Sequence, residues 1–202
     1  ITFTFHSNEI DLINKTRYCL EKYFNLKSSL NHLKGEKCTQ VVSSSKSLAL
    51  AISGWFGTKA CNKHIPKFVW NGTYDFKKSF IQGLYDGDGC IRPENNSWRI
   101  VSSSKILLVE LQFMLFSMGH FSTVNKNRDS KMMTILNREC QTNGLWELDI
   151  NFLGSKKSQY REDDNYFYVP VKKITTFQYH GDVYNFTTSS NIEQDNHTYC
   201  SD

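Results

Sequence analysis

Apolar residues recur at helical spacing after three short stretches that favour β-strand. The apolar runs span residues 12–24, 48–56 and 107–118, and their spacing of three and four positions predicts amphipathic helices. Serines stand before each run, at residues 7, 43–45 and 102–104, where a hydroxyl can cap the start of a helix. The same strand-then-helix order in three places predicts an internal repeat.

The interval between the copies indicates the length of the repeat. An offset of 96 residues places Ser7 on Ser103 and Leu12 on Leu108. We therefore predict a unit of about 96 residues with two capped helices in each complete copy. A further helical run, residues 77–89, would have its partner before residue 1, and we expect the first copy of that helix to precede this sequence.

The run at residues 77–89 has two unusual features. Gly83 and Gly87 lie on one helical face, and each glycine destabilises a helix by about 1 kcal/mol relative to alanine, which indicates close packing against a second helix. Asp86 and Asp88 stand at the C-terminal end, where the helix dipole disfavours anions. A basic side chain or a divalent metal would compensate for them, and an ordinary turn is the alternative interpretation of Asp-Gly-Asp-Gly.

Charge divides the chain into two parts. Residues 1–160 hold 21 Lys and Arg against 13 Asp and Glu, a net charge of +8, whereas residues 161–202 hold 3 against 7, a net charge of −4. A basic body followed by an acidic end indicates a polyanion-binding domain joined to a segment with another role.

Composition excludes several classes of protein. Aromatic residues make up 14% of the chain, too many for a disordered tail, and no apolar run approaches the length of a membrane span. The six cysteines never show the C-x-x-C spacing of a zinc or redox site, and we expect reduced thiols in an intracellular protein; they are Cys19, Cys38, Cys61, Cys90, Cys140 and Cys200.

Three blocks of sequence resemble one protein family. Ile81–Gly89 resembles the signature helix of the LAGLIDADG homing endonucleases. Lys63–Pro66 is similar to the Lys-x-Ile-Pro block between the two signature helices of such endonucleases inside inteins, and Ser103–Lys105 to the block after the second helix. The resemblance covers residues 1–160 with order and spacing preserved.

The resemblance implies an α+β fold built from two αββαββα repeats. Repeat one would cover residues 1–75 without its signature helix, and repeat two residues 76–160. In this family the two signature helices pair and the strands form one saddle over double-stranded DNA, so Gly83 and Gly87 would lie at the helix interface. The complete protein would be a pseudo-symmetric monomer.

The family also implies a metal site. The last acidic residue of each signature helix binds Mg²⁺ beside the scissile phosphate, which here implies Asp88 as the ligand, with Gly89 next to it counted in the metal site. Asp86 would have a packing or capping role. A metal held in this way lowers the pKa of a bound water and stabilises negative charge on the phosphate.

Lysines complete the implied catalytic set. Lys63 matches the active-site lysine of the first repeat, where its charge would stabilise the transition state. Lys156 or Lys157 would serve the second repeat, because they follow Phe152–Gly154 as Lys63 follows Phe56 and Gly57. A solvated surface residue is the alternative for each.

Strand faces and interstrand loops are the expected DNA contacts. In residues 2–6, Phe3 and Phe5 alternate with polar residues and should point inward. The opposite face could then read base edges in the major groove, and basic residues near the second hairpin and in a polar loop could contact phosphates. The predicted contacts are Thr2, Thr4 and His6 from the strand, Arg92 and Arg99 from the hairpin, and Lys126, Arg128 and Lys131 from the loop.

The acidic end resembles a different domain. Residues 162–164 indicate a linker, and residues 167–171 and 182–187 favour strands. Residues 181–199 resemble the penultimate block of an intein splicing (Hint) domain, in which the matching histidine, His197, assists asparagine cyclisation. An exposed loop histidine is the alternative. Residues 161–202 would thus be a short all-β part of a Hint domain.

The sequence therefore predicts a site-specific, Mg²⁺-dependent DNA endonuclease embedded in a self-splicing intein, with double-stranded DNA and the host exteins as partners. Two alternatives remain at this stage. One is a decayed nucleic-acid-binding module, and the other is an intein that retains only protein splicing.

Overall fold

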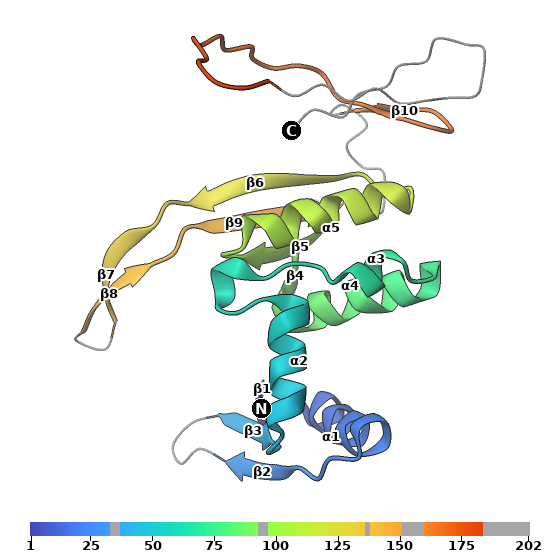
Figure 1. Ribbon diagram of the computed structural model, residues 1–202, viewed down its shortest axis with the longest axis vertical. Helices are drawn as coiled ribbons and strands as arrows, with labels where there is room; N and C mark the ends of the chain where they lie inside the picture. Colours follow the sequence, from blue (N-terminus) through green and yellow to red (C-terminus); the bar gives the residue numbers. More distant parts are fainter. Residues whose placement is uncertain (33–36, 93–96, 136–137, 151–159, 184–202) are drawn as a thin grey trace. The chain divides into compact units, whose positions relative to one another are not determined.

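The computed structural model describes two compact units, residues 1–158 and residues 159–202 (Figure 1). Among the residues it describes, no helix is long and apolar enough to cross a membrane. The described residues are 1–32, 37–92, 97–135, 138–150 and 160–183.

The chain begins with a small antiparallel sheet covered by one helix. Its elements are β1 (Thr2–His6), α1 (Ile10–Phe24), β2 (Ser29–His32) and β3 (Cys38–Val42), and the strand order is β1-β3-β2. Phe3 and Phe5 pack against the core of this sheet while Thr2, Thr4 and His6 are exposed, which confirms the predicted alternation of β1. The buried residues of this core are Ile13, Leu20, Val41 and Leu48.

A helical segment links the first sheet to the second. It consists of α2 (Lys46–Phe56), the 3₁₀ turn η1 (Ala60–Asn62), α3 (Lys67–Trp70) and α4 (Tyr74–Asp88). Thr73 caps α4, since its hydroxyl accepts a hydrogen bond from the Phe76 N–H at 3.3 Å. The helix predicted over residues 77–89 is therefore present, with Asp86 and Asp88 in its last turn.

The second sheet has four antiparallel strands in the order β4-β5-β9-β6. They are β4 (Gly89–Arg92), β5 (Ser97–Ser102), β6 (Ser122–Arg128) and β9 (Leu145–Ile150), with α5 (Lys105–Ser117) between β5 and β6. Strands β7 (Lys131–Ile135) and β8 (Arg138–Thr142) pair with each other and extend the β6–β9 ribbon away from the helices (Figure 1).

The two sheets share one topology. In each, a strand is followed by a helix and then two strands, and the last strand lies between the first two, as in β1-α1-β2-β3 and β5-α5-β6-β9. The offset of 96 residues moves β1 onto residues 98–102 and α1 onto residues 106–120. This arrangement agrees with the predicted repeat. The same offset moves α2 onto residues 142–152, where the structure has β9, so the offset of 96 residues holds for β1 and α1 and not for the later elements of the unit.

The predicted serine caps are correct for two of the three helices. Ser45 Oγ accepts from the Leu48 N–H, and Ser104 Oγ accepts from the Leu107 N–H, both at 3.2 Å. For α1 the prediction is wrong, because its N-cap is Glu9 and no side chain caps it. Ser7 lies farther upstream, where its hydroxyl accepts a 3.1 Å hydrogen bond from the Thr39 hydroxyl instead.

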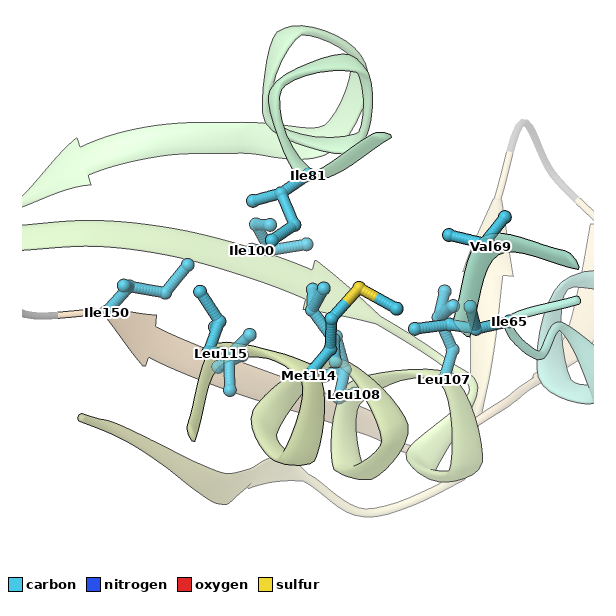
Figure 2. Packing of buried hydrophobic residues seen from close by; sticks show 11 residues of the cluster. Ile65, Val69, Ile81, Ile100, Leu107, Leu108, Met114, Leu115 and Ile150 are labelled. Atoms are coloured by element: carbon cyan, nitrogen blue, oxygen red, sulfur yellow. The ribbon is translucent and has the colours of Figure 1, made fainter. Parts of the chain in front are cut away.

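Helices α4 and α5 pack against one face of the four-stranded sheet. Figure 2 shows Ile81 of α4 and Leu115 of α5 pointing toward Ile100 and Ile150 on the strands. Burial of such side chains stabilises the fold by about 25 cal/mol for each Å² of apolar surface removed from water. It also fixes both helices to the sheet. The cluster consists of Ile65, Val69, Ile81, Ile100, Leu107, Leu108, Leu111, Met114, Leu115, Leu148 and Ile150.

The opposite face of this sheet carries a network of charges. Arg92 lies 2.8 Å from Glu147 and 3.0 Å from Asp149, and Arg99 lies 3.4 Å from the second oxygen of Glu147. Asn127 donates to that same oxygen at 2.8 Å. The four charged side chains, between 13% and 30% exposed, partly bury one another.

This network shifts the pKa of two of its members. Burial raises the pKa of the Glu147 carboxyl, but the hydrogen bond from Asn127 and the charges of Arg92 and Arg99 outweigh it, so the pKa lies below its ordinary value. The pKa of Arg99 is raised, chiefly by a hydrogen bond with Cys90. Glu147 is therefore more acidic in the folded protein than in the unfolded chain.

The second unit contains one described hairpin, β10 (Arg161–Glu162) and β11 (Phe167–Tyr168). Asp163 forms its turn: its carboxylate accepts from the Asn165 and Tyr166 N–H groups at 2.9 and 2.8 Å and from the Tyr168 hydroxyl at 2.6 Å. These bonds lower the pKa of Asp163, with that from Tyr168 contributing most. The prediction of a linker at residues 162–164 is therefore wrong, because the short acidic run is ordered by its own turn.

Gly57 should be the less replaceable of two glycines with positive φ. Gly57 (φ +83°, ψ 170°) lies in a region adopted almost only by glycine, and a Cβ there would be 2.2 Å from the Asn62 carbonyl oxygen. At Gly119 (φ +79°) a Cβ meets no described atom within 4 Å. In urea unfolding, we expect Gly57→Ala to lower the free energy of unfolding by more than about 2 kcal/mol. We expect Gly119→Ala to lower it by about 1 kcal/mol. Equal losses would contradict the close approach of the 57–62 turn.

Glu147→Gln should destabilise the folded protein more at neutral pH than at acid pH. The ion pairs of Glu147 contribute fully above its ordinary pKa of 4.5 and are lost as the pH falls through the lowered value. We expect a loss of about 1–2 kcal/mol in the free energy of unfolding at pH 7, shrinking toward pH 3. The exposed Glu21→Gln is the control, and a loss that does not depend on pH would refute the network.

Candidate active site and nucleic-acid interface

Asp88 ends α4 with its side chain 58% exposed. Its Oδ2 lies 4.0 Å from the Nζ of Lys63, which comes from the turn between η1 and α3. The structure thus brings together two residues that sequence reasoning selected from separate blocks. The lysine supplies the positive charge expected at the negative end of the helix.

Asp86 has a different environment although it lies two residues away. Its Oδ1 accepts a hydrogen bond from the Gln82 Nε2 at 2.6 Å, one helical turn earlier. Asp86 is therefore engaged within α4, while the Asp88 carboxylate faces Lys63. Asp86 is exposed, and the packing or capping role expected for it stays a prediction.

The turn that carries Lys63 is attached to α5 by its backbone. The Lys63 carbonyl accepts a 2.6 Å hydrogen bond from the Ser104 hydroxyl, and the Ile65 N–H donates to Glu110 Oε2 at 2.6 Å. Neither bond could be predicted from local sequence, because they join positions 41 and 45 residues apart. Glu110 is a site residue that sequence reasoning missed.

The glycines of α4 and its end fall into two groups. A Cβ at Gly83 or Gly87 would meet no described atom within 4 Å, so the close helix partner predicted for them does not come from the described residues. Gly89 instead approaches Tyr85, whose ring would be 2.3 Å from an added Cβ. The predicted role of Gly83 and Gly87 at a helix interface, and that of Gly89 in a metal site, stay predictions.

The candidate site offers one carboxylate to a metal ion, so a metal bound there would need further ligands from a bound molecule. Among the described residues, no group of three His, Cys, Asp or Glu side chains could hold a metal ion. Mg²⁺ commonly uses one or two carboxylates together with waters and substrate phosphates. Asp88, exposed at the end of a helix, offers the single carboxylate that such a shared site requires.

The predicted DNA contacts lie on strands of the first sheet, of the second sheet and of the β7–β8 pair. Thr2, Thr4 and His6 are exposed on β1, as expected. Arg92 and Arg99 lie on the face of the second sheet opposite the helices, but their guanidinium groups are ion-paired with Glu147 and Asp149, a constraint that their sequence neighbours do not reveal.

The basic residues at positions 126–131 were expected in a loop, and this prediction is wrong. Lys126 and Arg128 belong to β6, with an irregularity in the strand pairing between them, and Lys131 begins β7. Lys126 also forms an ion pair with Asp129 and lies 6.0 Å from the centre of the Trp146 ring. The polar run forms a strand because a two-stranded ribbon can be solvated on both faces.

Three predicted site residues lie outside the described residues: Lys156, Lys157 and His197. Their roles stay predictions.

Comparison with known proteins finds a domain family that part of the chain matches and solved structures with a similar fold. Residues 75–145 match the family model of the LAGLIDADG-like domain. A crystal structure of I-DmoI in complex with DNA and calcium matches with a TM-score of 0.53 and 19% identity, over 78% of this chain and 71% of that chain. Mesophilic variants of the homing endonuclease I-DmoI match with a TM-score of 0.52 and 18% identity, over 78% of this chain and 75% of theirs.

The curated relatives are longer proteins. An iron-sulfur cluster assembly SufBD family protein of Mycobacterium tuberculosis is 24% identical over 92% of this chain, which spans 22% of that protein. The RNA polymerase protein Rpo1C of Methanocaldococcus jannaschii is 30% identical over 50% of this chain and 12% of its own length. A DNA gyrase protein of Mycobacterium gordonae is 26% identical over 51% of this chain and 19% of its own length.

This chain therefore spans about a fifth or less of those three relatives. Residues 75–145 are thus similar to the LAGLIDADG-like domain, and the chain is similar in fold to the homing endonuclease I-DmoI.

Proposed function

We propose that this chain is the site-specific, double-stranded DNA endonuclease of an intein, and that it hydrolyses phosphodiester bonds with Mg²⁺. The observation that carries the proposal is the approach of Lys63 to Asp88 at the end of α4. The LAGLIDADG-like match includes Asp88, and the structural neighbours include a single-substitution variant of I-DmoI crystallised with its target DNA in the presence of magnesium.

Asp88 and Lys63 would divide the chemistry between them. Asp88 would hold the divalent ion with its exposed carboxylate. When bound, that ion supplies a water of lowered pKa and neutralises charge on the phosphate. Lys63 Nζ, beside the same carboxylate, stabilises the negative charge that develops on the phosphate oxygens.

The strand faces would bind the duplex. A two-stranded ribbon fits the major groove, where side chains can read base edges. Thr2, Thr4 and His6 present such a row on β1, and the β6–β9 ribbon with its β7–β8 extension carries Lys126, Arg128 and Lys131 for phosphate contacts. A first signature helix with its own acidic residue, packed on Gly83 and Gly87, would complete a pseudo-symmetric monomer.

The range of proteins to which this chain is similar supports the proposal that it is a segment inserted within host proteins. Parts of this sequence are similar to short parts of a SufBD family protein, an RNA polymerase protein and a gyrase protein, whose names describe unrelated activities. Similarity of this kind is expected of an inserted element rather than of any one named activity. We therefore propose that residues 161–202 belong to a splicing domain, in an intracellular precursor with host exteins.

Asp88→Asn should abolish cutting while DNA binding persists. We expect the full-length protein with Mg²⁺ to linearise a plasmid carrying the uninterrupted insertion site. Loss of the ligand charge should slow cleavage at least about 100-fold. The control is Asp86→Asn, which keeps an oxygen acceptor for Gln82 and should stay within about fivefold of the wild type. Cleavage is followed on gels and binding by mobility shift.

Two results would change the assignment. Equal cutting by Asp88→Asn would remove Asp88 from the active site. A wild-type protein that binds the insertion site without cutting it would identify a decayed nucleic-acid-binding module.

Protein splicing should respond to a different residue. In a full-length precursor, His197→Ala should prevent cleavage after the terminal asparagine, because the histidine would assist its cyclisation. His180→Ala, an exposed histidine of the same unit, should splice as the wild type does. Mass spectrometry of the products distinguishes the two, and unchanged cleavage in His197→Ala refutes its role.

A further inference from the structure

We propose that Ser104 and Glu110 are positioning residues of the active site, and that they hold the backbone of residues 63–65 so that Lys63 stays beside Asp88. This inference rests on the proposed nuclease function and deepens it. Ser104 is the N-cap of α5 and Glu110 lies within that helix, which is itself fixed to the sheet by the main core.

Ser104 joins the start of α5 to the lysine turn through one oxygen. Its side chain is fully buried, its hydroxyl donates to the Lys63 carbonyl at 2.6 Å, and the same oxygen accepts from the Leu107 N–H at 3.2 Å. The Ser104 N–H in turn donates to the Ser102 hydroxyl at 3.1 Å. Because a buried hydroxyl that makes two bonds has little freedom, the Lys63 carbonyl is held relative to the helix.

Glu110 holds the same turn two residues later. Its Oε2 accepts the Ile65 N–H at 2.6 Å, and a hydrogen bond to a charged acceptor is among the stronger ones in proteins. The Ile65 side chain is 3% exposed and lies in the main core. The two bonds from α5 therefore bracket Lys63 and His64, one at the carbonyl of residue 63 and one at the amide of residue 65.

The backbone bonds matter because the side-chain contact is weak. Lys63 and Asp88 are 48% and 58% exposed and 4.0 Å apart, and exposed ion pairs of this kind do little to fix geometry. The segment before Lys63 is irregular, with positive φ at Gly57 and at Lys59. The His64 N–H also donates to the Phe56 carbonyl at 3.2 Å, and the two bonds from α5 add the restraints directly on either side of this residue, which can keep Nζ within reach of a phosphate at Asp88.

Ser45, the N-cap of another helix, offers a matched control for Ser104. Ser45 caps α2 in the same way, accepting from the Leu48 N–H at 3.2 Å, and is preceded by the same Ser-Ser pair. Among the described residues, the Ser45 side chain forms one hydrogen bond, and that bond is the helix cap. Ser45→Ala therefore removes a cap, whereas Ser104→Ala removes a cap and the hold on Lys63.

The first experiment compares cleavage and binding in the full-length protein. With the insertion-site plasmid under single-turnover conditions, Ser104→Ala should cut about 10- to 100-fold more slowly, because small displacements of a catalytic group have effects of that size. Ser45→Ala should stay within about threefold, and both should bind DNA with affinity within about threefold of the wild type. Glu110→Leu should be slow, and Glu110→Gln, which keeps an oxygen acceptor, should recover most of the rate.

A double-mutant cycle tests whether the effect passes through Lys63. In a Lys63→Met background, Ser104→Ala should cause no further slowing, since the group that it positions is gone. A purely structural role would instead slow the two backgrounds by the same factor.

Amide hydrogen exchange tests the anchor without cleavage. The Ile65 amide should exchange at least about tenfold faster in Glu110→Leu than in the wild type, and remain protected in Glu110→Gln. If the wild type cuts but Ser104→Ala is no slower than Ser45→Ala, or Ile65 exchanges equally fast in all variants, the positioning role alone is overturned. A wild type that cuts no DNA overturns the nuclease function and the positioning role together.

Discussion

The direct passage from α4 into β4 is the constraint on which the candidate site depends. Asp88 is the last residue of the helix and Gly89 the first of the strand, with no linker between them. A Cβ at Gly89 would be 2.3 Å from the Tyr85 ring, and that ring stacks on Trp98 of β5 with centroids 3.8 Å apart. Because the helix end is pressed onto the sheet in this way, the Asp88 carboxylate has a fixed place relative to the strands.

Packing, and not charge, keeps this carboxylate where it is. Asp88 stands at the negative end of the helix dipole, and its exposed contact with Lys63 offsets that repulsion only in part. Ile81 anchors α4 through the core instead. An acid held by packing at an electrostatically unfavourable place remains available to a cation and a phosphate, which is why its position indicates function more than stability.

Features that depend on neighbouring residues could be predicted from the sequence, whereas contacts between distant residues could not. The caps of α2 and α5, the alternation in β1 and the extent of α4 follow from neighbouring residues. The cap predicted for α1 failed because Thr39, far along the chain, engages Ser7. The pairing of Arg92 and Arg99 with Glu147 depends on strand register across about 50 positions, and the bond from Ile65 to Glu110 on tertiary packing. Such partners leave no periodic trace in one sequence.

The ion pairs on the second sheet limit how Arg92 and Arg99 could contribute to DNA binding. Arg92 and Arg99 are neutralised by Glu147 and Asp149, so the net charge of +8 in residues 1–160 does not come from that face. If DNA lies across it, as proposed, a paired arginine gains less from a nearby phosphate than an unpaired one, because a carboxylate already satisfies part of its charge. Its remaining N–H groups keep a fixed direction, which favours base edges over the phosphate backbone. The basic residues of β6 and β7 would then provide the non-specific attraction to phosphates, and the sheet face would read the base sequence. Affinity and specificity would therefore reside on different strands.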